Sequence, residues 1–302
     1  MSPREPTQPD PSDEEEREQE ESQARVEAGG IPLAAERRLR ELGEGAGAFT
    51  SDLSVGSFAL CHELGLTPLA QVMGSSIYQV GGYAGVLPGA YAGGYIYELD
   101  ALSGAWNEAR DRAFRRMAIE AGELGADAVV GVTMRKGERD FTEGAIECVV
   151  VGTAIRADGR ARGSAEAGRA SGRAVLTELS VPDYAKLRRA GIETLGVVAW
   201  TSIFFVQSWT SASLGRALGL MPNQELAEYT RGVYEARESA MSRVTAQAAS
   251  IEASGVVGMR VEHIVRPGGQ NGLIMGFDVI GTAIRQAEAK EPGAPETIVN
   301  LN

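Results

Sequence analysis

The densest group of potential metal ligands in the chain is the run Cys61-His62-Glu63. Thiolate, imidazole and carboxylate groups are the ligands that zinc and similar ions take in proteins. Neighbouring residues point in different directions on a helix or a strand, so one ion cannot easily receive all three. Cys61 and His62 are therefore candidate metal ligands, and the alternative is a buried cysteine beside a surface histidine.

Other residues that could do chemistry favour structural roles. Cys148 lies in the mostly apolar run 146–151, where a free cysteine behaves as a small core residue. His263 lies in an expected strand, at a surface or hairpin position. Asp127 and Ser254 each follow an expected helix, and both side chains can hydrogen-bond nearby backbone amides. No catalytic triad, acid pair or metal constellation is recognisable, so an enzyme is the least favoured class of function.

The glycine-rich stretch 81–94 is interspersed with tyrosines, among them Tyr83 and Tyr91. It has no Gly-Lys-Ser/Thr ending and does not open a helix directly, as a phosphate-binding loop would. We interpret it as a mobile loop at a subunit interface, and a loop that grips a ligand is the alternative.

The composition argues against several classes of partner. The chain has 302 residues, a formal net charge of −12 and two cysteines. An acidic chain without a basic patch is not typical of a nucleic-acid-binding protein. The few cysteines and the lack of a secretory signal predict a cytoplasmic protein. The most apolar stretch, 195–206, is shorter than the roughly 20 residues of a membrane helix, so it predicts a strand buried on both faces rather than membrane insertion.

The first 50 residues form an acidic tail with 13 acidic and 6 basic residues. Such a segment buries too little apolar surface to offset its chain entropy, so residues 1–25 are expected to be disordered. Residues 32–42 could form a short helix, because Ala35, Leu39 and Leu42 would share one side. The tail is interpreted as solubilising, with a docking arm for a basic partner as the alternative.

An internal repeat organises the rest of the chain. Four short blocks recur in the same order at offsets of 126 to 129 residues. They are Leu53-Ser54-Val55 with Leu179-Ser180-Val181, Glu108-Ala109-Arg110 with Glu235-Ala236-Arg237, Val129-Val130-Gly131 with Val256-Val257-Gly258, and Gly152-Thr153-Ala154-Ile155-Arg156 with Gly281-Thr282-Ala283-Ile284-Arg285. The repeat predicts one domain at 51–156 (copy one) and a second at 175–286 (copy two). A flexible linker at 157–174 would join them, and a frayed end at 287–302 would follow.

Each copy is expected to be a β-α-β-β unit of the α+β class, preceded by a short helical segment at 55–64 or 181–190. The first strand is predicted at 67–73 in copy one and 193–200 in copy two. The last two are predicted at 128–134 and 146–155, and at 255–265 and 273–284. Between them lies a long helix with an alanine-rich stripe, which in copy one runs through Ala109, Ala113, Phe114, Met117, Ala118, Ala121 and Leu124. Arg110, Arg112, Arg115, Arg116 and Glu120 occupy much of its other side. Gly125 suits the left-handed position that ends a helix.

These blocks resemble the YbjQ-type domain, a family usually called "putative heavy-metal-binding domain". The most specific string is Leu124-Gly125-Ala126-Asp127-Ala128-Val129-Val130-Gly131-Val132, which copy two matches more loosely as Ala253-Ser254-Gly255-Val256-Val257-Gly258. The resemblance implies a dodecin-like unit that assembles into pentameric rings in which strands of neighbours pair. It also implies a metal ion as a candidate cofactor, without a ligand set to transfer to this chain.

Three classes of function remain open. The favoured one is a non-enzymatic homo-oligomer that assembles through its sheet edges, because unpaired edges need partners. The second is a metal-binding or metal-responsive oligomer. The third is a small-molecule binder at subunit interfaces.

Overall fold

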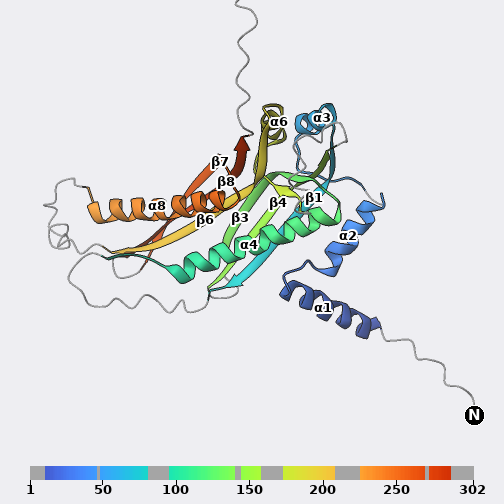
Figure 1. Cartoon of the computed structure of the whole chain (residues 1–302). Helices are drawn as coiled ribbons and strands as arrows, with labels where there is room; N and C mark the ends of the chain where they lie inside the picture. Colours follow the sequence, from blue (N-terminus) through green and yellow to red (C-terminus); the bar gives the residue numbers. More distant parts are fainter. Residues whose placement is uncertain are drawn as a thin grey trace, which may run out of the picture.

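The computed structural model describes residues 11–45, 48–80, 95–139, 144–157, 173–207, 225–268 and 272–286. Within them the chain forms two four-stranded sheets, and a long helix packs on each (Figure 1). The stretch 81–94, most of the predicted linker, the loop 269–271 and the C-terminal residues 287–302 lie outside the described residues. The predictions made for these segments therefore stay predictions.

The first sheet is built mainly by copy one and has the strand order β1-β4-β3-β5. Its strands are β1 (Leu66–Gln79), β3 (Ala128–Arg139), β4 (Ala145–Ala157) and β5 (Val175–Leu176). The helix α4 (Asp100–Glu123) packs on β1 and β4. The predicted β-α-β-β order is present, with strands longer than predicted.

The second sheet is built mainly by copy two and has the order β2-β6-β8-β7. Its strands are β2 (Tyr95–Glu98), β6 (Ile192–Gln207), β7 (Gly255–Pro267) and β8 (Gly272–Gln286). The helix α8 (Ala227–Ser250) packs on β6 and β8 as α4 packs on β1 and β4. Residues 201–207 of β6 are all buried, so the second half of the predicted stretch 195–206 is covered on both faces, whereas Leu195, Gly196, Val197 and Trp200 are only partly buried. No helix in the described part of the chain is both long and apolar enough to cross a membrane.

The two copies exchange short strands. β2 precedes α4 in copy one, yet it pairs antiparallel with β6 of copy two. β5 opens copy two, yet it pairs parallel with β3 of copy one. The short helices α3 (Val55–Glu63) and α6 (Val181–Arg189) also contact each other across the two copies (Figure 1). Each copy therefore completes the other's sheet, so the sheets do not follow the boundaries predicted from the repeat.

Most of the predicted alanine stripe of α4 faces its sheet, whereas Phe114 and Ala118 border the space between the two copies. Ala109, Ala113 and Met117 are fully buried against the sheet. The helix lies so close that a Cβ at Gly74 of β1 would stand 1.8 Å from the Ala113 carbonyl oxygen, which only glycine permits. The helix ends as predicted at Gly125, whose φ is +63°.

The other side of α4 is only partly exposed. Arg110 and Glu120 are both buried. Arg110 donates to Asn107 and Asp111 in the region where α4 meets copy two. Glu120 accepts from the Met73 amide and from Arg38 of α2. Copy two and the helix α2 thus cover parts of this side of α4.

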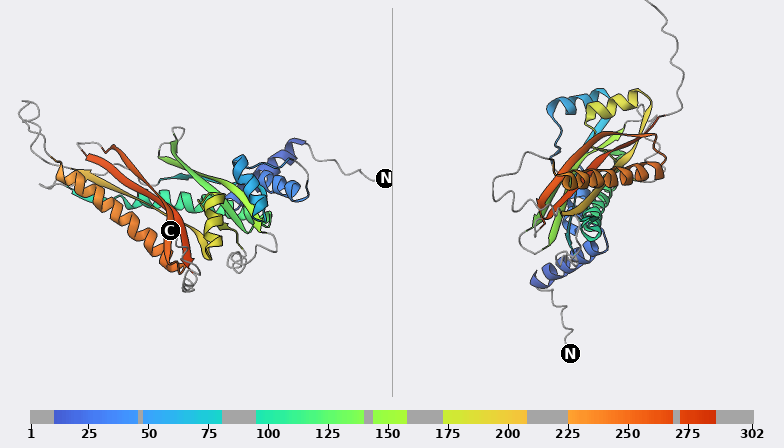
Figure 2. Two further views of the ribbon diagram at one scale, coloured as in Figure 1. Left: turned by 90° about the horizontal axis from the view of Figure 1, so that it is seen from above. Right: turned by 90° about the vertical axis from the view of Figure 1, so that its left-hand side faces the viewer.

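Part of the acidic tail differs from the prediction. Of the residues 1–25 expected to be disordered, 1–10 lie outside the described residues, and the rest belong to the helix α1 (Pro11–Glu27). The helix α2 (Leu33–Gly43) follows as predicted. Both lie at the end of the molecule away from α8 (Figure 2). Arg116 of α4 donates to the carbonyl oxygens of Val26 and Gly30, at 2.8 and 3.0 Å, and ion pairs join Arg25 and Arg37 to glutamates. The arginines thus hold an acidic helix that its own composition does not stabilise.

Candidate functional site

Copy two docks on the edge of copy one through backbone hydrogen bonds. Gly131 of β3 has a φ of +64° and lies in a β-bulge. Such a bulge interrupts the ladder and frees amides for another partner. Four bonds of 2.9 to 3.1 Å join the copies here: Val175 N to Asp127 O, Thr177 N to Val129 O, Val132 N to Thr177 O, and Gly131 N to Leu179 O.

A buried ion pair lies at the centre of this interface. The Nζ atom of Lys136 in copy one lies 2.5 Å from Oδ1 of Asp278 and 2.9 Å from Oγ1 of Thr201, both in copy two. Thr201 also donates to Asp278, at 2.8 Å. The Lys136 ammonium lies 5.5 Å from the centre of the Trp106 ring. Burial lowers the pKa of Lys136, and the Asp278 carboxylate acts in the opposite direction.

Asn107 of α4 occupies the edge of β6 as a neighbouring strand would. Its Nδ2 donates to the Thr201 carbonyl and its Oδ1 accepts from the Thr201 amide, both at 2.9 Å. Ser103 repeats part of this pattern one turn earlier, where its hydroxyl accepts from the Ile203 amide at 2.9 Å. Polar side chains of copy one thus satisfy backbone groups of copy two that would otherwise be buried without partners.

Apolar side chains from both copies pack together around the short helices. One cluster of buried residues combines Cys61, Leu66, Ala128, Val130, Ile155 and Ala157 of copy one with Leu179, Val181 and Tyr184 of copy two. On the α4 side, Ile203, Phe205 and Ile274 of copy two belong to the core cluster of copy one. The two copies therefore share their cores, and their interface is part of the fold.

The backbone groups that join the two copies have counterparts, by the repeat, on the outer side of each copy. In copy one, residues 49–53 correspond to 175–179. Thr50 O accepts from the Gln71 amide and Asp52 accepts from Thr153, so this segment lies against its own domain. At the opposite end, β7 is the edge of its sheet, and Gly258 repeats the bulge with a φ of +65°. Within the described residues, no further strand pairs with β7 beyond β8, or with residues 48–54.

Apolar residues at the same outer positions are exposed. Ile77 is 57% exposed, whereas its counterpart Ile203 is 1% exposed in the interface. Tyr234 is 61% exposed, whereas its counterpart Asn107 is buried. Phe58, Met73 and Met259 are further exposed residues whose counterparts, Tyr184, Ala199 and Val132, are buried. Apolar residues are thus exposed on the outer faces at the positions whose counterparts are buried in the interface between the two copies.

The predicted metal ligands Cys61 and His62 have different surroundings. Cys61 is fully buried in the shared apolar cluster, and this burial raises the pKa of its thiol, which disfavours the thiolate that binds metal. His62 is exposed and lies edge-on to Phe58, with ring centres 5.0 Å apart. Among the residues that the structure describes, no three His, Cys, Asp or Glu side chains form a group that could hold a metal ion. Within the described residues Cys61 and His62 thus have no third ligand beside them, and their role as metal ligands stays a prediction.

The other predicted residues take the structural roles expected of them. Cys148 is fully buried in the core of copy one. His263 is exposed and stacks on Phe277. Asp127 accepts from the Ala157 amide at 2.8 Å, and Ser254 accepts from the equivalent Gln286 amide at 2.9 Å.

The interface residues Asn107, Lys136 and Asp278 were not singled out from the sequence. Their counterparts in the other copy are Tyr234, His263 and Val149, so the chemical character of each position changes between the copies. A buried polar group matters only where a partner stands opposite, and that partner comes from a distant part of the chain. The mismatch between repeat positions is the one sequence signal that could have indicated them.

Comparison with known proteins finds a matching family and several similar proteins. The sequence model of the family described as "Putative heavy-metal-binding" matches residues 90–158 and 189–287. Over 274 residues the chain is 33% identical to the "Encapsulin nanocompartment protein Rv1762c" of Mycobacterium tuberculosis, and the match covers 90% of this chain and 97% of that protein. Over 59 residues it is 44% identical to a UPF0145 protein of Natronomonas pharaonis and 46% identical to one of Clostridium novyi. Each of these shorter matches covers 20% of this chain and 55% of the relative.

The family match falls on both halves of the repeat, and each half contains the long helix and the strands that follow it. The chain therefore belongs to the family described as "Putative heavy-metal-binding" and carries two tandem copies of its domain.

Proposed function

We propose that the chain is a non-enzymatic, self-assembling subunit whose molecules join head to tail, through contacts like those between its own two copies. The observation that carries this proposal is the exposure of Ile77 and Tyr234 at positions equivalent to buried interface residues. Exposed apolar surface of this kind marks a protein interface. The outer edge of β7, which no strand pairs among the described residues, and the segment 49–53 would supply complementary backbone groups.

The proposed contact is heterologous, because the outer face of copy two would meet the different outer face of copy one. A heterologous contact closes into a ring when its rotation allows, and otherwise continues as a filament. A closed, dodecin-like ring leaves no edge unpaired, which favours the ring. The name of the Mycobacterium tuberculosis relative, a nanocompartment protein, supports a role in a protein assembly.

Two variants test the head-to-tail geometry by blocking one face each. Ile77→Lys places a charge on the outer face of copy one, and Tyr234→Lys places one on that of copy two. Each variant alone should lose the large assembly, measured by size-exclusion chromatography with light scattering. When the two are mixed, each chain retains the face that its partner needs. The mixture should therefore form a capped dimer of about 64 kDa, twice the chain mass of 31.9 kDa.

Ala249→Lys is the matched control, because Ala249 is exposed and its counterpart Gly122 in copy one is exposed as well. This variant should assemble like the parent protein. A mixture of the two blocked variants that stays monomeric would contradict the head-to-tail contact. Full assembly of either variant alone would contradict the placement of the interface.

Metal binding, which the family's description names, stays a separate hypothesis for this chain. Its candidate ligands are Cys61 and His62. Metal analysis of the purified protein tests it, with Cys61→Ala and His62→Ala as variants. Bound metal that both variants lose would support the hypothesis, and a metal-free protein would oppose it.

A further inference from the structure

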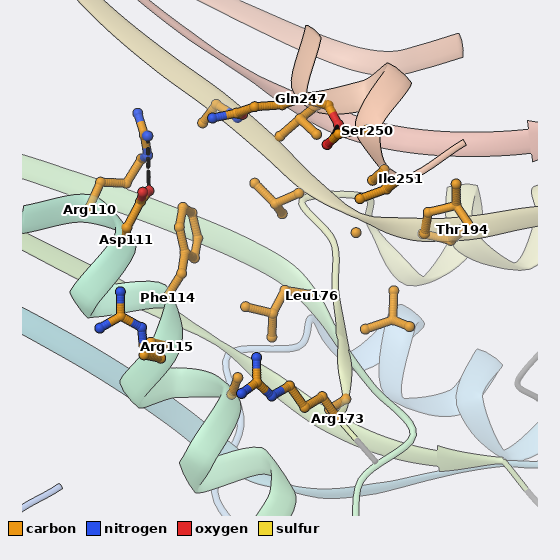
Figure 3. A pocket seen from close by; sticks show the side chains of 18 of the residues that line it. Arg110, Asp111, Phe114, Arg115, Arg173, Leu176, Thr194, Gln247, Ser250 and Ile251 are labelled. Carbon is orange, nitrogen blue, oxygen red and sulfur yellow. Dashed lines mark hydrogen bonds and ion pairs between the residues drawn. The ribbon is translucent and has the colours of Figure 1, made fainter. Parts of the chain in front are cut away.

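A cavity of about 760 Å³ lies between the two copies (Figure 3). Successive turns of α4 in copy one line the cavity on one side. The first half of β6 and the end of α8, both in copy two, line it on the other. The cavity is complete within one chain, so it does not depend on the proposed assembly.

The cavity is cationic in a protein whose net charge is −12. Four arginines and one aspartate line it. Arg110 is paired with Asp111, and Arg285 is paired with glutamates. Arg115 and Arg173 make no hydrogen bond or ion pair within the described part of the chain. Two arginines thus remain available to an anion.

A buried hydroxyl in the same wall also lacks a partner. Thr194 of β6 is only 8% exposed, and its Oγ1 has no hydrogen-bond partner among the residues that the structure describes. A buried polar atom without a partner costs free energy, so a water molecule or a polar ligand atom beside the Thr194 hydroxyl would be stabilised there. Figure 3 shows Arg115 on α4 at the left, Arg173 at the bottom and Thr194 at the right.

Apolar side chains line the space between these polar groups. They are Phe114 of α4, Leu176 of β5 and Ile251 at the end of α8. An apolar wall with a few polar groups is typical of small-molecule sites. A ligand that fits would have an apolar body and an anionic group at one end.

The repeat does not supply these groups twice. The counterparts of Arg115 and Thr194 are Ser242 and Pro68, and the counterpart of the cavity residue Gln247 is the acidic Glu120. An equivalent space between two chains would lack the arginine and the hydroxyl and would gain a carboxylate. The site is therefore specific to the contact inside the chain, with one copy per subunit.

We propose that this cavity binds a small amphipathic anion, with its carboxylate or similar group at Arg115 and Arg173 and its apolar body against Phe114, Leu176 and Ile251. Charge-assisted hydrogen bonds from the two arginines would hold the anionic group. An apolar molecule without the charge would lose these bonds, and inorganic phosphate would lose the apolar contact.

Calorimetric titration of the full chain with 2-naphthoate tests the proposal, with neutral 2-naphthamide and inorganic phosphate as comparison probes. We expect 2-naphthoate to bind once per chain and each comparison probe to bind at least about tenfold more weakly. Arg115→Ser, which introduces the residue of copy two, and Arg173→Ser should each weaken 2-naphthoate by about tenfold. Both side chains are exposed, so the variants should melt like the parent protein.

Arg231→Ser is the control, because Arg231 is a surface arginine outside the cavity that forms an ion pair with Glu235. It should bind 2-naphthoate like the parent. Equal affinity for 2-naphthoate and 2-naphthamide would overturn the proposal. Unchanged binding in Arg115→Ser and Arg173→Ser, or no binding of 2-naphthoate at all, would overturn it as well.

Discussion

Val55 and Val181 begin equivalent helices in the two copies, yet Val55 is 87% exposed and Val181 is 1% exposed. Val181 is covered because its helix packs on copy one, where it joins a cluster with Cys61 and Val130. Nothing in the described residues covers Val55 in the same way. The difference between the two valines shows that the burial of this position depends on contact with the other copy.

This pair gives a matched test of the interface. Val55→Glu should change the free energy of unfolding of the dissociated chain by no more than about 0.5 kcal/mol, because the side chain is exposed there. Val181→Glu should cost about 3 kcal/mol or more, because it buries a charge in an apolar cluster. Urea denaturation at low protein concentration measures both. Val55→Glu should also weaken assembly by at least about tenfold in sedimentation experiments. An unaltered assembly would exclude Val55 from the contact.

The Lys136–Asp278 pair should behave as a buried ion pair that joins the copies. Asp278→Val leaves the Lys136 ammonium buried without its partner, and we expect a loss of about 3–5 kcal/mol. Valine is also the residue at the equivalent position in copy one, Val149. The double variant Lys136→Met, Asp278→Val should recover most of the loss, because no buried charge remains. Urea denaturation of the three proteins checks this. A double variant no more stable than Asp278→Val would disprove the pairing.

Glu120 should make stability depend on pH. Burial raises its pKa from 4.5, and the Met73 amide and Arg38 act in the opposite direction. The folded protein keeps the proton at pH values where the unfolded chain has released it, so this contribution to stability is full below pH 4.5 and is lost as pH rises through the raised pKa. Glu120→Gln removes the contribution and keeps an acceptor for Met73, as Gln247 does for Ala199 in copy two.

The stability of Glu120→Gln relative to the parent should therefore increase from pH 4.5 to pH 7.5. Urea denaturation across this range measures the difference in the free energy of unfolding. A difference that stays constant or decreases with pH would mean that Glu120 has no raised pKa.

The two cysteines should be unreactive in the folded protein. Burial raises the pKa of Cys148 to about 11 and also raises the pKa of Cys61. At pH 8 the thiolate fraction of Cys148 is on the order of one in a thousand, and the thiolate is the reactive form. We expect Ellman's reagent to titrate neither thiol in the native protein and both in urea. Rapid reaction of one thiol in the native state would show that its site is open.

Within each copy, local patterns predicted the fold well. The alanine stripe of α4 has the helical period, and Gly125 adopts the left-handed conformation that its place after the helix requires. Asp127 and Ser254 differ in chemistry yet bond equivalent amides, as their shared position indicated. Patterns of this kind depend on neighbours within a few residues, which the sequence displays directly.

The exchange of strands depends on distant residues and was not predictable. β2 has four residues and β5 has two, which is too short for an alternating pattern. Their partners lie in the other copy. The helix α1 is a similar case, because its acidic composition predicts disorder, and Arg116 binds its last turn from 90 residues further along the chain. The interface residues were not predictable for the same reason. Lys136 and Asp278 form an ion pair only when the two copies pack together.

We expect the outer faces of the two copies to join different molecules. Native mass spectrometry of the full chain at low micromolar concentration would detect this assembly. We expect one dominant closed oligomer whose mass is a whole multiple of 31.9 kDa. A protein that remains at 31.9 kDa even at tens of micromolar would contradict it, because the exposed Val55, Ile77 and Tyr234 would then have no partner chain.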